Sequence, residues 1–155
     1  CRTFILTSAA ASCRDTVKVG DIVVASGFSG KSAPEMPLEA FEKPRPETLL
    51  ALGLRRLACE TGKAAGLRMY EGRIAMVSGP LVPILSGDLP DMQSSGIDVA
   101  VTSILNEAMI VALYPGTRAL GLSLVSIAHD GTDYVPTPEH TAKRGELLTG
   151  IIAQL

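Results

Sequence analysis

The sequence predicts a single α/β domain with a mixed, mostly parallel sheet flanked by helices. Short apolar segments with strand character alternate with helical segments along the chain, an order typical of α/β folds. The strand segments are apolar at consecutive positions, as expected for a sheet covered on both faces. With 155 residues, 46% of them hydrophobic, the chain is long enough for one domain with a sizeable core.

In the first half of the chain we expect two strands, a loop and a helix. Residues 3–7 are an apolar run, which indicates a buried strand. A second short strand follows a glycine turn at residues 21–24, and the proline-rich residues 26–46 form an ordered loop. Pro46 suits the first turn of a helix that ends near Gly66.

In the second half of the chain we expect three further strands, over residues 73–77, 98–101 and 120–127. We also expect two helices, one over residues 104–114 and one from 138 to about 155. Thr137-Pro138-Glu139 is a good start for the last helix, because it offers a hydroxyl cap, a proline and then an acid. Residues 84–95 are ambiguous, since Gly87 and Pro90 weaken a helix there.

The first strand has the character of a central strand, yet it opens at the very first residues. Neighbouring strands and covering helices would then be missing, and the unpaired backbone groups of this strand would form an open edge. We therefore expect residues 1–155 to form one incomplete domain. We also expect association with other protein chains, as a homo-oligomer or in a larger complex.

Charge and composition exclude several function classes. The net charge is −2 and no run of Lys or Arg is present, so nothing recruits nucleic acid or an anionic membrane by charge. No apolar stretch approaches the roughly 20 residues that span a bilayer. Cys1, Cys13 and Cys59 have neither metal-site nor redox spacing, which predicts no bound metal and a reducing compartment, cytoplasmic or organellar. The chain begins with Cys rather than Met, which indicates a processed chain, a truncated chain or a fragment.

Several short motifs follow one another in order: Leu6-Thr7-Ser8-Ala9-Ala10, Val19-Gly20-Asp21-Ile22-Val23, Gly27-Phe28-Ser29-Gly30, Tyr70-Glu71-Gly72 through Gly79-Pro80, Gly96-Ile97-Asp98 through Asn106-Glu107, and Gly121-Leu122-Ser123-Leu124-Val125. Together they resemble the phosphorylase superfamily, in particular its trimeric purine nucleoside and methylthioadenosine phosphorylases. No single motif is strong, so the order and spacing over residues 3–155 carry the resemblance. In that family these segments form the second half of one domain, whose first half supplies a glycine-rich turn and the Arg and His residues that hold phosphate.

The resemblance implies phosphorolysis, in which inorganic phosphate displaces a purine from the anomeric carbon of a ribose. The transition state resembles an oxocarbenium ion, with negative charge leaving on the base. Catalysis therefore needs donors aimed at the purine and a held phosphate. Phosphate is the co-substrate, and no cofactor or metal is implied.

The resemblance also assigns candidate phosphate and ribose contacts. Phosphate contacts fall at Ser103, just ahead of a helix, and at Ser8 and Ala9 near the end of the first strand. Helix N-termini favour anions, although Ser103 is equally consistent with an ordinary helix cap and the small residues with simple packing. Ribose contacts fall at Thr102, where the family has Met, and at His140, for which a solvated histidine is the alternative.

Two positions depart from the family pattern where it grips the base. This chain has Pro83 in place of a Glu and Ile127 in place of an Asn, and neither side chain can hydrogen-bond a purine. Asp130 and Asp133 match, with imperfect spacing, aspartates that handle adenine in methylthioadenosine-type relatives. The alternative is an ordinary turn at Asp130 and the glycine that follows it.

These departures, with the missing first half, predict a degenerate purine nucleoside phosphorylase-like protein. It would have no independent activity and would serve as a structural or accessory subunit of a larger assembly. The alternative is a fragment or split half of an active purine nucleoside or methylthioadenosine phosphorylase, completed by another polypeptide. A purine-binding module without turnover is a third hypothesis.

Overall fold

The computed structural model of the chain describes residues 1–28, 50–78, 81–129, 134–136 and 138–153. The elements follow the order β1 (Thr3–Ser12), β2 (Ile22–Phe28), α1 (Leu52–Ala64), β3 (Met69–Met76), α2 (Leu81–Ser94), β4 (Val99–Val101), α3 (Leu105–Ala112), β5 (Arg118–His129), β6 (Tyr134–Pro136) and α4 (Pro138–Ile152). Strands and helices alternate over most of this length, which confirms the predicted α/β class.

The first five strands close into a ring. β1 pairs with β4 and β5, β2 pairs with β3 and β5, and β3 pairs with β4, while β6 adds to the end of β5. Parallel pairs (β1–β5, β2–β3, β3–β4) and antiparallel pairs (β1–β4, β2–β5, β5–β6) both occur. The mixed sheet is therefore confirmed, but the predicted mostly parallel layer between helices is replaced by a closed barrel. The physical reason is that β1 and β5 each pair along both edges, which brings the two ends of the sheet together.

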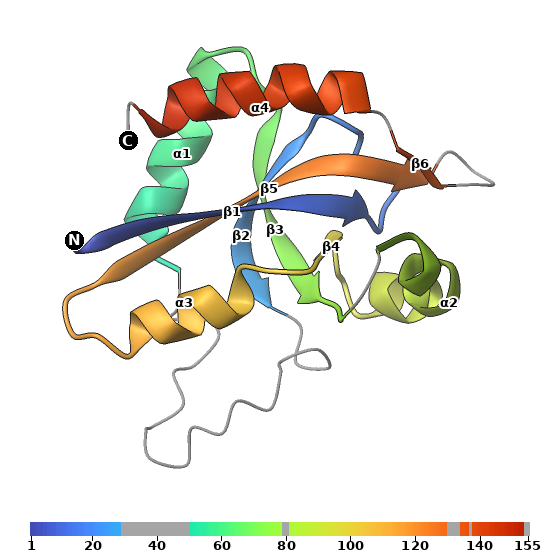
Figure 1. The fold of residues 1–155 in the computed structure, drawn as a ribbon, viewed down its shortest axis with the longest axis horizontal. Coiled ribbons are helices and arrows are strands. Elements are labelled where there is room, and N and C mark those ends of the chain that lie inside the picture. The colour runs from blue at the N-terminus through green and yellow to red at the C-terminus, as the bar shows by residue number, and fades with distance from the viewer. Residues whose placement is uncertain (29–49, 79–80, 130–133, 137, 154–155) are drawn as a thin grey trace.

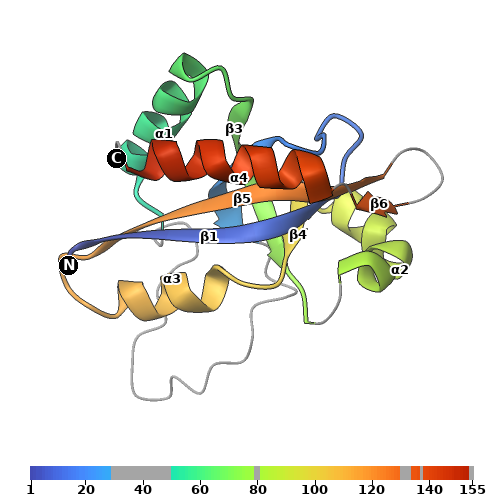
Figure 2. The ribbon, with the colours of Figure 1, turned by 45° about the horizontal axis from the view of Figure 1, so that its top comes forward.

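Successive residues of the long ribbon formed by β1 and β5 face two different apolar clusters, as the alternation of side chains in a strand requires. One cluster contains Ala119 and Val125 of β5 and extends through the barrel to the buried side of α3. The other contains Leu122 of β5 and packs under α1 and α4 through residues such as Leu54 and Ile152. Figures 1 and 2 show α3 on one side of the ribbon and α4 on the other.

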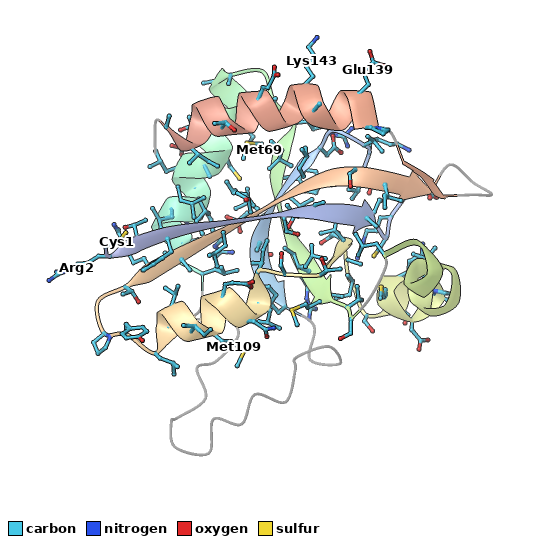
Figure 3. All side chains as sticks on the ribbon, in the orientation of Figure 1. Cys1, Arg2, Met69, Met109, Glu139 and Lys143 are labelled. Carbon is cyan, nitrogen blue, oxygen red and sulfur yellow. The ribbon has the colours of Figure 1, made fainter. Side chains whose placement is uncertain are left out.

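A third apolar cluster lies under α2 at the far end of the barrel. It combines Ala11 of β1, Ala100 of β4 and Met92 of α2, and Figure 1 shows α2 at the end where β1 and β6 terminate. The outer face of α4 is polar: Figure 3 shows Glu139 and Lys143 pointing away from the barrel, and both are exposed. None of the described helices is both long and apolar enough to cross a membrane.

Two elements differ from the sequence expectation. Of residues 84–95, all but the last belong to the helix α2, with Pro90 inside it. That proline is exposed, while Leu81, Leu89 and Met92 share one helix face against the cluster under α2, so tertiary packing outweighs the local breakers. The short strand β6 was not expected and follows from its antiparallel pairing with the end of β5.

Helix α1 begins later than the sequence suggested. Its first residue is Leu52, and Leu50 forms a bridge with Ala119 of β5. The predicted start at Pro46 and most of the predicted loop fall outside the described residues. The predicted end is confirmed, because Gly66 has φ 74°, the left-handed conformation that favours glycine after a helix.

Candidate functional site

The end of β4 lies beside β1, at the residues to which the resemblance assigns phosphate. Ala10 of β1 is opposite the last residue of β4. Antiparallel strands run past each other, so Thr102 and Ser103, which follow β4, continue in the direction of Ala9 and Ser8. Thr102 and Ala9 are exposed, whereas Ser103 and Ser8 are half-buried. The register therefore places the backbones of these four residues near one another, although the side chains of Ser8 and Ala9, as successive residues of a strand, point to opposite faces.

The start of α3 forms one wall of this place. Its N-cap residue is Ile104, with φ 87° and ψ −50°, and no side chain caps the helix by a hydrogen bond. The alternative that Ser103 is an ordinary capping serine is therefore wrong. The N–H groups of a first helical turn that lack a side-chain acceptor attract anions. A positive φ at a β-branched residue is strained, and such strain is concentrated at functional sites.

Ile127, the residue at the expected base-binding position, lies in an apolar environment. It pairs with Ala11 of β1 on one side and Pro136 of β6 on the other. Its half-buried side chain packs against the apolar cluster under α2. Ala9 is two residues before Ala11 on β1, about 7 Å away at the usual rise of a strand, so Ile127 lies near the hydroxyl-bearing residues without adding a polar group.

The remaining predicted site residues are only partly described. The backbone of Pro83 lies in the first turn of α2 and that of His140 in the first turn of α4, but their side chains lie outside the described part of the chain. Asp130 and Asp133 lie outside it entirely. Figure 1 shows that α4 begins beside β6, so the backbone of His140 is at the same end of the barrel as Ile127.

Sequence reasoning did not foresee a cluster of polar contacts around Asp98, just before the start of β4; we call it the Asp98 cluster. Asp98 accepts a hydrogen bond from the backbone N–H of Arg73 at 2.8 Å and forms an ion pair with Nε of Arg14 at 3.0 Å. The preceding Gly96 has φ 75°. The neighbouring thiol of Cys13 is buried, and this burial, with a smaller effect from Asp98, raises its pKa to about 12. The sequence signal for the Asp98 cluster was the Gly-Ile-Asp motif, whose role here is therefore to stabilise the fold.

A separate pocket of about 320 Å³ lies between α1 and β3, away from these residues. Cys59 and Lys63 of α1 and Tyr70 of β3 are among its lining residues, and Figure 3 shows Met69 at the same junction. Burial raises the pKa values of Cys59 and Tyr70 above their ordinary ranges, so neither ionises readily. Among the described residues, no group of three or more His, Cys, Asp or Glu is placed to hold a metal.

Comparison with protein families decides the relationship that the motifs suggested. The sequence matches the family model of the phosphorylase superfamily over residues 1–126. The chain belongs to this superfamily. A comparison with curated protein sequences gave no match.

Several solved structures share the fold of this chain. A Schistosoma purine nucleoside phosphorylase in complex with hypoxanthine has a TM-score of 0.77 and 22% identity, covering 97% of this chain and 60% of that chain. The Schistosoma mansoni enzyme in complex with inosine has a TM-score of 0.75 and 22% identity, covering 99% and 60%. The same enzyme with adenosine gives 0.75 and 21%, covering 99% and 61%. This phosphorylase-superfamily chain thus shares their fold but spans only about 60% of their length.

Proposed function

We propose that this chain is a degenerate purine nucleoside phosphorylase-like protein, without phosphorolysis activity of its own, that serves as a structural or accessory subunit of a larger assembly. The observation that carries this proposal is Ile127, whose side chain packs with apolar residues at the position expected to bind the purine. An alkyl group cannot donate to a leaving base. Loss of one donor of this kind costs on the order of 10²–10³ in rate.

The charge of the candidate phosphate site supports the same proposal. The residues that the resemblance assigns to phosphate, namely Ser8, Ala9 and Ser103, are all neutral, and so is Thr102, which it assigns to the ribose. A negatively charged group that is transferred in a reaction is usually bound by Arg, Lys or a metal ion. A site made of hydroxyls and a helix start therefore needs cationic groups from elsewhere. We infer that residues 1–155 form a partial domain, completed by another polypeptide within a homo-oligomer or a larger complex.

One observation favours the alternative, a fragment or split half of an active purine nucleoside or methylthioadenosine phosphorylase. Ser103 does not cap α3 by a hydrogen bond, and the start of that helix still faces the small residues of β1. An active site that had lost its role has no reason to retain a strained, uncapped helix start. Under this alternative, inorganic phosphate is the co-substrate, Thr102 and His140 contact the ribose, and Asp130 or Asp133 contacts the base.

Phosphorolysis assays separate the two proposals. Inosine and methylthioadenosine are each incubated with phosphate and the purified chain, and release of the free purine is followed by chromatography. The same assays are repeated with the Schistosoma mansoni segment that has no counterpart in this chain. Ile127→Asn restores a donor, and Ile127→Leu is the matched control.

We expect no turnover from the chain alone, and turnover in the completed assembly only for Ile127→Asn. Turnover by the wild-type chain only when the missing segment is supplied establishes the split-enzyme alternative. Turnover by the isolated wild-type chain contradicts both.

A further inference from the structure

The surface above Gly96 lies at the end of β4 opposite to the candidate site. Gly96 follows the last turn of α2: its N–H donates to the carbonyl of Gln93, and the N–H of Ile97 donates to the carbonyl of Met92. These two bonds, with φ 75° at Gly96, form the Schellman motif that ends many helices. The backbone therefore requires a glycine here, and the surface above it carries no side chain of its own.

Two arginines converge on this bare surface. A Cβ atom placed on Gly96 would lie 3.8 Å from Nη2 of Arg14 and 3.9 Å from Nη1 of Arg73. Apart from the chain neighbours of Gly96, no other described atom comes within 4 Å of that point. The two guanidinium nitrogens therefore cannot be farther apart than these two distances combined. We call these two residues the arginine pair.

Arg14 is held by the inner edge of its guanidinium group. Its Nε donates to the carbonyl of Ile97 at 3.1 Å and forms the ion pair with Oδ1 of Asp98 at 3.0 Å. The terminal Nη1 and Nη2 groups make no hydrogen bond with the described residues, and 41% of the side chain is exposed. The anchor at Nε thus holds Nη2 beside Gly96 with its N–H groups unused.

Arg73 carries a charge that no carboxylate in the described ranges neutralises. Its backbone N–H donates to Oδ2 of Asp98 at 2.8 Å, and its carbonyl accepts from the N–H of Asp98 at 2.9 Å. Its exposed guanidinium group makes no ion pair or hydrogen bond there. Both oxygens of Asp98 are already used, one by Arg14 and one by the Arg73 backbone. The arginine pair therefore keeps a net positive charge, although the whole chain has a net charge of −2.

Closing the end of α2 is the alternative role for these arginines. Cations near a helix C-terminus interact favourably with the helix dipole, and α2 has no basic residue in its own last turn. Arg14 serves this role through Nε, which bonds the carbonyl of Ile97 just beyond the helix. The role does not explain Arg73, whose guanidinium group reaches Gly96 without bonding a described carbonyl. Two like charges side by side repel, so a second arginine at this place calls for an anion.

We propose that Arg14, Arg73 and the bare backbone at Gly96 form a binding site for a phosphate group, carried by inorganic phosphate or by a phosphate monoester. Guanidinium groups bind such oxyanions through short, charge-assisted hydrogen bonds, and an anion between two arginines offsets their mutual repulsion. The missing side chain lets the anion approach the backbone closely. The site is separate from the phosphate position that the resemblance assigns to Ser103, because the two lie at opposite ends of β4, and it does not rest on the proposed function.

Backbone amide NMR spectra of the full chain locate the bound anion. Inorganic phosphate and glycerol 3-phosphate are titrated in turn, with chloride at matched ionic strength as the reference, because salt screens exposed charges. We expect saturable shifts of the Gly96 and Ile97 amides at millimolar phosphate and none with chloride. Shifts with both ligands mean that the site accepts a phosphate group on a larger molecule, whereas shifts with inorganic phosphate alone restrict it to the free ion.

Arg73→Gln tests the contribution of the arginine pair. The substitution removes one of the two cations but keeps the backbone bonds between residue 73 and Asp98. We expect the phosphate affinity to fall by about 10-fold or more, with an unchanged urea midpoint. Arg73→Lys keeps the charge without the planar fork, so its affinity is expected to lie between the two. Arg56→Gln is the matched control, because Arg56 is exposed on α1 and lines the separate pocket, and we expect it to leave the affinity unchanged.

Four results would overturn the proposal. Phosphate could fail to shift the Gly96 and Ile97 amides in a saturable way, or Arg73→Gln could bind phosphate as tightly as the wild-type chain. An equal loss of affinity in Arg56→Gln would mean that net charge alone attracts the anion. Shifts confined to the amides that follow Ser103 would place the phosphate at the candidate site instead. Turnover is not measured, so these outcomes are independent of whether the chain catalyses phosphorolysis.

Discussion

Two buried serines have opposite expected effects on stability when their hydroxyl groups are removed. Ser123 of β5 is 0% exposed, and its Oγ has no hydrogen-bond partner among the described residues. Ser12 at the end of β1 is 1% exposed, but its Oγ donates toward the carbonyls of Arg14 at 2.7 Å and Val17 at 2.9 Å and accepts from the N–H of Arg14.

The magnitudes follow from these contacts. A buried polar group without a partner costs about 1–3 kcal/mol of desolvation, and Ser123→Ala removes that group with almost no change in volume. We expect Ser123→Ala to stabilise the chain by about 1–2 kcal/mol, which raises the melting temperature by about 2–8 °C for a chain of this size. Ser12→Ala leaves two carbonyls and an N–H without their partner, so we expect a loss of about 1–3 kcal/mol.

Urea unfolding followed by circular dichroism measures both changes as shifts of the transition midpoint at constant slope. Ser126→Ala is the matched control on β5, because its hydroxyl makes only a long contact of 3.4 Å with the carbonyl of Ala10, and we expect a change within about 0.5 kcal/mol. A destabilising effect of Ser123→Ala comparable to that of Ser12→Ala would refute the reasoning, because it would mean that the Ser123 hydroxyl is satisfied inside the barrel.

Two further predictions concern the base of β4. Burial raises the pKa of Cys13 from 9.0 to about 12, so the neutral thiol stabilises the folded chain fully below pH 9, and this contribution is lost as the pH rises toward 12. In urea titrations we expect the free energy of unfolding to fall less steeply over that pH range for Cys13→Ala than for the wild-type chain. An unchanged fall would contradict this. Asp98→Ala leaves the Arg73 N–H and the Arg14 guanidinium without their carboxylate, so we expect the free energy of unfolding to fall by about 1–3 kcal/mol. The exposed Asp15→Ala is the control, with almost no expected change. Equal effects of the two substitutions would contradict a stabilising role of the Asp98 cluster.

Most of the strands could be predicted from apolar runs, but the closure of the barrel could not. Runs such as residues 120–127 identify strands because consecutive apolar residues must be covered on both faces. The pairing of β1 with both β4 and β5 depends on contacts between distant segments, which local patterns do not encode. Helix α2 was uncertain for the same reason, since Met92 and the cluster beneath it decide its conformation.

The candidate site was predicted only as far as the motif order allowed. The resemblance selected Ser103 and Ala9, and the structure brings the two segments together at the end of β4. Local patterns do not indicate that Ile104, rather than Ser103, is the N-cap residue of α3, because a positive φ at isoleucine opposes its local preference. The roles of Pro83, His140 and the two aspartates stay predictions.

The pairing of the first strand with two late strands has a consequence for how the chain acquires its fold. In the part of the chain that the structure describes, β1 pairs with Val99–Val101 and Arg118–His129, so a ribosome must synthesise about a hundred residues after β1 before both partners exist. Contacts between segments so far apart in sequence slow folding, and the waiting strand is exposed to other nascent chains. During synthesis the apolar segment Phe4-Ile5-Leu6 therefore stays exposed until the segments that pair with β1 have been made.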